Sequence, residues 1–199
     1  VLRFLIVWIQ TLFSPLITSL LFLSVLSLAI GNDRGDVLGV PFIVFLAPGL
    51  IAMQIIQQAF SHSSSSFMIG KIQGNIVDLV YAPLSAGEVT LAVTLASVTR
   101  SVLIAVISLL VFYLFIDLEI KNFITLIAFT LLSAFSLGAL GIIAGLWAEK
   151  FDHMATVTNF VIIPLSFLSG TFYSIERLPE ILQVISKANP FFYMIDGFR

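Results

Sequence analysis

Length and composition exclude most classes of soluble protein. The chain has 199 residues, of which 59% are hydrophobic and only 10% are charged, and its net charge is −2. A typical soluble domain is about 45–50% apolar and about 25% charged, so a soluble enzyme and a nucleic-acid-binding domain both fit poorly. The sequence has no cysteine, which excludes disulfides, thiolate metal sites and cysteine nucleophiles. A polytopic membrane protein remains.

Five stretches are long and apolar enough to cross a bilayer. A helix needs about 20 apolar residues to cross roughly 30 Å of hydrocarbon, whereas barrel strands alternate over about 10 residues. We therefore predict an all-α polytopic membrane protein with spans at residues 4–30, 40–60, within 86–116, 123–147 and about 155–172. The longest predicted internal loop is 61–85.

Polar stripes mark the first two predicted spans. At helical spacing they consist of Thr11, Ser14 and Thr18 and of Gln54, Gln57 and Gln58. Lipid leaves hydroxyls and amides unpaired, so each stripe should face protein or a water-filled path. Hydrogen bonding between helices is the first interpretation, and lining of a transport path is the second.

The predicted loop contains signals for a short helix followed by a long one. Asn75 is a suitable N-cap and Asp78 complements the helix dipole, while Pro83 should end the helix. Ser85 and Glu88 have the spacing of a capping box, which predicts a second helix that runs as far as residue 116. These patterns alone leave two roles for the short helix, because it either rests on lipid or docks a soluble partner.

No residue pattern predicts an enzyme, a cofactor site or a metal site. His62 and His153 fall in different predicted loops, without an acidic residue placed to orient either. The serines at 63–66 are interpreted as a solvated helix end. Gly70 and Lys71 are followed by Ile72, so the phosphate-loop motif fails. ATP hydrolysis is therefore expected on a separate subunit.

Nearly all charged residues lie in the predicted loops, and Arg100 is the only clear exception, because it lies within a predicted span. It lies about 6 Å from the inner edge of the hydrocarbon core, so snorkelling or pairing at that interface is the first interpretation and a transport role is the second. The central stretches of the spans contain no Asp or Glu. This argues against a carrier driven by protons or ions, because such carriers usually need an intramembrane carboxylate.

Small residues form one face of the fourth predicted span. Gly138, Gly141 and Gly145 recur along it, following Ala134. Small residues let membrane helices approach closely. Packing within one subunit is the first expectation, and a homodimer contact is the second.

After the fifth span, residues 173–199 contain two further helix signals. Pro179 suits the first position of one helix, and Asn189 with Pro190 forms a cap and first turn for another. Aromatic residues cluster at the ends of these helices. We interpret them as an interfacial belt.

Four motifs occur in a fixed order along the chain. They read WIQTL with PL at 8–16, LAPGLI at 46–51, KIQGNI with APLS at 71–85, and NPFFYM with GFR at 189–199. In order and spacing they resemble the ABC-2 type permease family, the membrane subunits of ATP-driven exporters, over essentially the whole chain.

The resemblance implies a six-helix subunit with a cytoplasmic N-terminus in a bacterial-type inner membrane. Residues 1–199 would form one transmembrane domain, with the sixth span beyond Arg199. Residues 173–199 would form extracytoplasmic re-entrant helices. Two copies would pair as a homodimer, and each would dock a separate ATP-binding subunit that carries ATP and Mg.

The resemblance also implies that the cytoplasmic loop at 61–87 contains a coupling helix. The implied contacts with the ATPase are Gly74, Asn75, Ile76, Leu79, Val80, Tyr81 and Pro83. The predicted function is export of a lipid, a glycolipid or polysaccharide, or a hydrophobic drug. An ion-coupled secondary transporter or a non-transporting membrane scaffold is the alternative.

Overall fold

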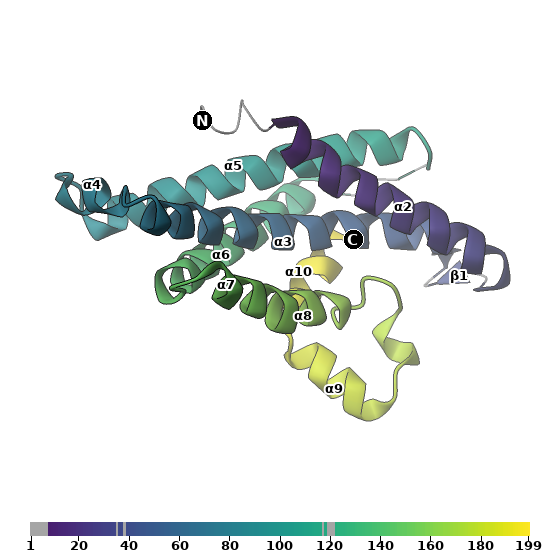
Figure 1. Ribbon diagram of the computed structural model, residues 1–199. Coiled ribbons are helices and arrows are strands. Elements are labelled where there is room, and N and C mark those ends of the chain that lie inside the picture. The colour runs from purple at the N-terminus through teal and green to yellow at the C-terminus, as the bar shows by residue number, and fades with distance from the viewer. Residues whose placement is uncertain (1–7, 35, 38, 117, 119–121) are drawn as a thin grey trace.

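The computed structural model of the chain is a bundle of long apolar helices (Figure 1). It describes the backbone of residues 8–34, 36–37, 39–116, 118 and 122–199, and within these ranges the side chains of 8–11, 30–34, 36, 79–80 and 177 lie outside the description. Four helices of the described part are long and apolar enough to span a membrane: α2 (Trp8–Arg34), α3 (Phe42–Ile72), α5 (Ala86–Tyr113) and α6 (Phe123–Trp147). The predicted all-α polytopic fold is confirmed. Residues 4–7 of the first predicted span lie outside the described residues.

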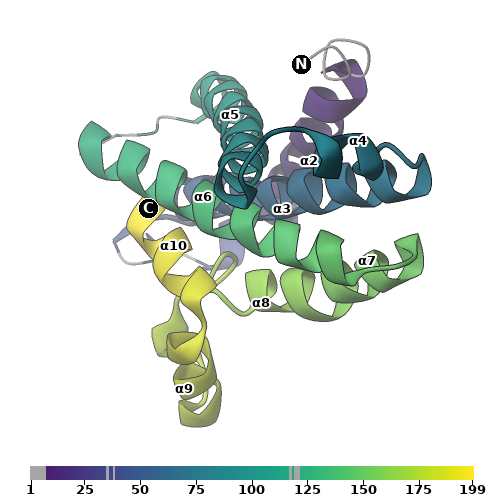
Figure 2. The same cartoon turned by 90° about the vertical axis from the view of Figure 1, so that its left-hand side faces the viewer.

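Helix α3 is the central element of the bundle. It packs along α5 and α6 and is crossed by α2, as the two views in Figures 1 and 2 show. Its fully buried side chains include Phe45, Leu46, Ile55 and Ile56, which meet Phe112 and Leu137 from the neighbouring helices. The outward faces of α2, α5 and α6 carry exposed Leu, Ile and Phe. Such apolar outer faces suit lipid contact.

The predicted loop at 61–85 is wrong over its first half, because α3 continues to Ile72. Three of its serine hydroxyls, those of Ser64, Ser65 and Ser66, bond back to the helix: Ser64 donates to the Phe60 carbonyl at 2.8 Å and Ser66 to the His62 carbonyl at 2.7 Å. This back-bonding keeps hydroxyls satisfied inside a helix. Ser63 and Ser64 are fully buried, so the interpretation of a solvated helix end is also wrong.

The two ends of the bundle carry different short elements. One end bears α4 (Ile76–Tyr81) together with the turn between α6 and α7. The opposite end bears a small hairpin of β1 (Asp36–Val37) and β2 (Val40–Pro41), in which Val37 pairs with Val40. The turn of this hairpin contains Gly39 at φ 81°, which a glycine adopts without strain. The hairpin is an addition to the predicted all-helical chain.

The helical run at the fifth predicted span begins four residues before 155 and ends five residues before 172. It consists of α7 (Phe151–Val157), the π-helix η1 (Thr158–Ile162) and α8 (Ile163–Phe167). Pro164 has no N–H to continue an α-helical ladder, and a π turn directly precedes it, as is common where such a ladder is interrupted. The run is about 25 Å long, somewhat less than the roughly 30 Å of hydrocarbon.

The chain then turns back toward the bundle through three short helices. They are the 3-10 helix η2 (Ile175–Arg177), α9 (Glu180–Ala188) and α10 (Pro190–Phe198). Pro179 precedes α9 rather than opening it, whereas Asn189 caps α10 as predicted by accepting from the Phe191 N–H at 3.0 Å. Figure 2 shows α9 projecting away from the bundle and α10 lying beside α6. Phe191 and Phe198 are buried, so part of the predicted aromatic belt belongs to the core.

Candidate functional site: the α4 end and the groove between α2, α3 and α8

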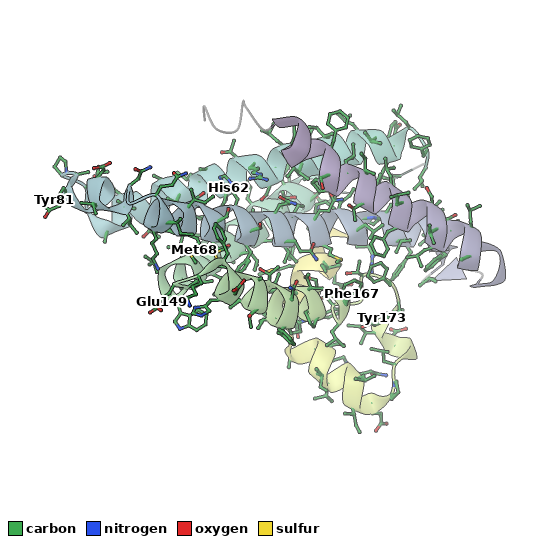
Figure 3. The ribbon with its side chains drawn as sticks, viewed as in Figure 1. His62, Met68, Tyr81, Glu149, Phe167 and Tyr173 are labelled. Carbon is green, nitrogen blue, oxygen red and sulfur yellow. The ribbon has the colours of Figure 1, made fainter. Side chains whose placement is uncertain are left out.

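Helix α4 forms the tip of one end of the bundle. Gly74 ends α3 with a left-handed φ of 74°, which reverses the chain into α4. Tyr81 lies at the extreme tip in Figure 3 and is 84% exposed. Ile72, Val77 and Leu84 are exposed beside it. The α4 end, defined as residues 72–84, therefore presents apolar and aromatic side chains that the rest of the chain does not cover.

The helix begins at Ile76, but Asn75 does not cap it with its side chain. Asn75 has helical backbone angles, and its amide instead bonds to the Gln73 side chain at 3.4 Å. Asn75 thus occupies the predicted N-cap position without forming the capping hydrogen bond, and the left-handed Gly74 sets the entry of the chain into α4. Gly74, Asn75 and Pro83 are exposed and Ile76 is half-buried. Leu79 and Val80 lie in α4, and their side chains are outside the described part.

The capping box at the start of α5 is confirmed. Ser85 Oγ accepts from the Glu88 N–H at 3.3 Å, and the Ser85 N–H donates to Glu88 Oε2 at 2.7 Å. The Ser85 N–H, followed by the Ser85 hydroxyl, holds the pKa of the exposed Glu88 carboxyl below its usual value of 4.5. The helix is about 42 Å long, which exceeds the hydrocarbon thickness. It ends at Tyr113 rather than at 116.

A lysine ties the base of α4 to the adjacent turn. Lys71 Nζ donates to the Ala148 carbonyl at 2.9 Å and also to the Leu146 carbonyl. Both carbonyls belong to the end of α6, where intrahelical partners run out. No local sequence pattern predicts this contact, because the partners are separated by more than 70 residues.

The structure brings the two predicted polar stripes together. Ser14 and Thr18 from α2 face Gln54, Gln57 and Gln58 from α3 across a cavity of about 310 Å³. Residues of α8 and the following turn complete its wall. We call this cavity the α2–α3–α8 groove. Thr11 lies in α2, but its side chain is outside the described part.

Gln54 and Arg100 mainly connect helices. Gln54 donates to the Pro15 carbonyl at 2.6 Å and accepts from the Ser108 hydroxyl at 3.0 Å, which joins α2, α3 and α5. Arg100 of α5 contacts His62 Nδ1 at 2.8 Å and donates to Gln58 Oε1 at 3.4 Å. His62 is thus a residue of α3, not of a loop as expected, and it lies next to the intramembrane arginine.

The glycine face of α6 packs within the same chain. A Cβ on Gly138 would lie 2.4 Å from Ser97 Oγ, and one on Gly141 would lie 2.5 Å from the Phe60 carbonyl oxygen. A Cβ on Gly145 would lie 2.8 Å from the Ser64 carbonyl oxygen. Glycine is therefore required for the close approach of α6 to α3 and α5.

A second contact between distant segments joins the start of α10 to α8 and the turn after it. Asn189 is 4% exposed and donates to the Leu165 carbonyl at 2.7 Å and to Ser169 Oγ at 3.0 Å. The only sequence signal was the Asn-Pro cap, which uses the other side-chain atom of Asn189.

These features define a polytopic membrane permease: apolar spans, a polar groove among them and an exposed helix at one end. The ABC-2 type transporter family model matches residues 1–199, and the chain belongs to this family. Among the described residues, no group of His, Asp or Glu could hold a metal ion.

Two named relatives match the chain over most of its length. The inner membrane transport permease YadH of Escherichia coli K12 is 33% identical over 197 residues, which cover 99% of this chain and 77% of the relative. Nodulation protein J of Rhizobium leguminosarum bv. trifolii is 24% identical over 96% of this chain and 73% of the relative. No solved structure matches the chain. The family and the YadH relative support an integral inner-membrane transport permease subunit.

Proposed function

We propose that this chain is the membrane subunit of an ABC-2 exporter that works with a separate ATP-binding subunit. In this proposal two copies pair around the transport path, the N-terminus is cytoplasmic and each α4 docks one ATPase. The single observation that carries the docking role is the exposed apolar tip at residues 72–84. Helix-in-groove recognition uses apolar anchors of this kind.

The connections of α4 suit transmission of motion. It joins the end of α3 directly to the capped start of α5, and both helices continue through the bundle. Lys71 adds a third link to the end of α6. A displacement of α4 by the closing ATPases would therefore move α3, α5 and α6 together. ATP drives this only if the ATPase contacts differ between the two states.

The cargo side of the proposal rests on the groove and on residues 173–199. Cargo would enter among the spans and leave on the outer side, where α9 and α10 would form a re-entrant gate. Lipids, glycolipids or polysaccharides, and hydrophobic drugs are the proposed cargo classes. ATP and Mg would bind the partner subunit.

Charged substitutions at the tip test the docking role. Ile76→Asp and Tyr81→Asp in the full-length permease should lower ATPase affinity about tenfold or more, because an unpaired carboxylate at an apolar contact costs on the order of 2 kcal/mol. The matched variants Ile76→Val and Tyr81→Phe should keep it. Co-purification of the ATPase and ATP-driven transport in vesicles are the measurements, with membrane insertion as the control.

Normal ATP-driven export by both Asp variants would contradict docking through α4. Transport driven by an ion gradient, without any co-purifying ATPase, would instead favour the secondary transporter.

A further inference from the structure

The α2–α3–α8 groove has the size of a small-molecule site. Its volume is about 310 Å³, at the lower end of the range of ligand pockets. Its lining includes the glutamines of α3, which we call the amide part, and the neighbouring aromatic rings of α2, α8 and the turn after α8, which we call the aromatic part. Phe167, which belongs to this aromatic part, lies midway along the bundle in Figure 3.

The amide part of the groove offers unused hydrogen-bonding groups. Gln57 is half-buried and forms no hydrogen bond among the described residues. Gln58 accepts a hydrogen bond from Arg100 through Oε1. Because arginine can only donate, this contact fixes the orientation of the Gln58 amide and leaves its N–H₂ group available to donate to a ligand. Unpaired amides are costly in apolar surroundings. A ligand that pairs with them is therefore favoured over lipid tails.

Hydroxyls on the facing helix supply acceptors. Thr18 Oγ1 donates to the Ser14 carbonyl at 2.9 Å, which leaves its oxygen lone pairs free to accept. The Gln57 carbonyl oxygen is a further acceptor. The groove thus presents donors and acceptors side by side, which matches a hydroxyl group, since a hydroxyl both donates and accepts.

The aromatic part suits an apolar group of the same ligand. The Phe167 and Phe172 rings stack with centroids 5.2 Å apart, and Phe22 meets Phe172 at 6.0 Å. Aromatic faces of this kind pack against hydrocarbon chains and against the C–H faces of sugar rings. One end of the bound molecule is therefore expected to be polar and the other apolar.

No charged side chain lines the groove among the described residues. Arg100 donates to Gln58 and contacts His62, but it is not among the residues that line the groove. Among the described lining residues, a phosphate would therefore find no cation and an ammonium group would find no carboxylate. A charged headgroup would therefore be desolvated without compensation.

We propose that the α2–α3–α8 groove binds an uncharged amphiphile with a hydroxyl-bearing headgroup, such as a neutral glycolipid. The headgroup bonds to Gln57, Gln58 and Thr18, and the apolar part lies against the three phenylalanines. This rests on the proposed transport function and narrows its cargo to one chemical class.

The test uses two fluorescent lipids that differ only in headgroup. They are nitrobenzoxadiazole-hexanoyl glucosylceramide, which is neutral, and the corresponding ceramide-1-phosphate, which is anionic. The full-length permease is equilibrated with each lipid in nanodiscs, and native mass spectrometry of the released protein gives the fraction that carries one bound labelled lipid. We expect half-saturation at about tenfold lower mole fraction for the glucosyl lipid, the effect of one or two net hydrogen bonds.

Removal of the Gln57 amide should reduce this preference. Gln57→Leu, or the length-preserving Gln57→Met if the Leu variant fails to insert, should bind the glucosyl lipid several-fold more weakly and the phosphate lipid as the parent protein does. Gln73→Leu, which removes an exposed amide outside the groove, is the matched control and should keep the tenfold preference. Equal or tighter binding of the phosphate lipid by the parent protein would overturn the proposal, as would an unchanged preference in the inserted Gln57 variant.

The tip variant Ile76→Asp separates this inference from the docking proposal. It should lose ATP-driven transport and keep the lipid preference. Loss of transport together with a normal preference supports both proposals. Normal transport by both Ile76→Asp and Tyr81→Asp contradicts the docking role and leaves the groove proposal unaffected, since lipid binding is measured without ATPase.

Discussion

Lys71 and Ala148 are joined by a 2.9 Å hydrogen bond from the lysine ammonium to the alanine carbonyl. Lys71 lies in the last turn of α3, immediately before the turn into α4, and Ala148 follows the last residue of α6. Carbonyls at a helix end lack intrahelical partners and carry the negative end of the dipole. The cation therefore fastens the base of α4 to the turn that leads into α7.

We expect Lys71→Met to lower the amount of cargo moved per ATP hydrolysed. The variant keeps an apolar stem of similar length and loses a charge-assisted hydrogen bond, which contributes on the order of 1.5–3 kcal/mol. A roughly several-fold fall is expected in proteoliposomes that contain the partner ATPase. Lys150→Met is the matched control, because Lys150 is exposed and makes no such contact among the described residues. An equal effect of both substitutions would show that overall charge, not the link, matters.

The sequence predicted those features of the fold that depend on local signals. The Ser85–Glu88 capping box and the start of α4 at Ile76 follow from residues within one turn, and both are present. The spans follow from their apolar length. Such features need no knowledge of neighbouring helices.

The missed features depend on contacts between distant helices. Serines favour caps and turns in isolation, yet Ser63 and Ser64 continue α3 because they are buried where Gly141 and Gly145 approach. The pairing of His62 with Arg100 joins residues 38 positions apart. Neither contact between helices is encoded by neighbouring residues in the sequence. His62 was therefore expected in a loop.

Gly141→Ala should destabilise the bundle. Its Cβ would lie 2.5 Å from the Phe60 carbonyl oxygen and 3.0 Å from Ser63 Cβ, so that α3 and α6 must separate. Overpacking of this kind costs about 1–3 kcal/mol. Thermal unfolding of the detergent-solubilised protein, followed by size-exclusion chromatography, measures the effect.

Gly70→Ala is the matched control for that substitution. Gly70 is also helical, but a Cβ there would meet no atom within 4 Å. Alanine should leave stability unchanged or raise it by up to about 1 kcal/mol through helix propensity. Equal stability of the Gly141→Ala and Gly70→Ala variants would contradict the close packing of α6 on α3.

The first turn of α5 should loosen in acid. The Glu88 carboxyl has a pKa lowered from 4.5 by its hydrogen bonds to Ser85. A group with a lowered folded-state pKa stabilises the fold fully above its unfolded pKa, and this contribution is lost as the pH falls through the folded pKa. Amide hydrogen exchange of residues 86–90, corrected for intrinsic rates, should therefore rise below about pH 4.5.

Glu88→Gln provides the control for this pH dependence. Glutamine can still complete a capping box but does not titrate. In this variant, the protection of residues 86–90 against hydrogen exchange should not depend on pH between about 3 and 7, a range that includes the titration of the wild-type carboxyl group. The same acid-induced loosening in the variant would assign it to another group.

Asn189 should hold α10 against α8 through its amide rather than through its cap alone. Its Nδ2 donates to the Leu165 carbonyl and Ser169 Oγ, while its Oδ1 accepts from the Phe191 N–H. Asn189→Asp retains the acceptor for the cap and removes both donors, and Asn189→Ala removes both functions. Each lost buried bond costs about 1–3 kcal/mol, so both variants should raise hydrogen exchange in α10. Wild-type protection in Asn189→Asp, with loss only in Asn189→Ala, would show that the cap and not the bridge to α8 orders this segment.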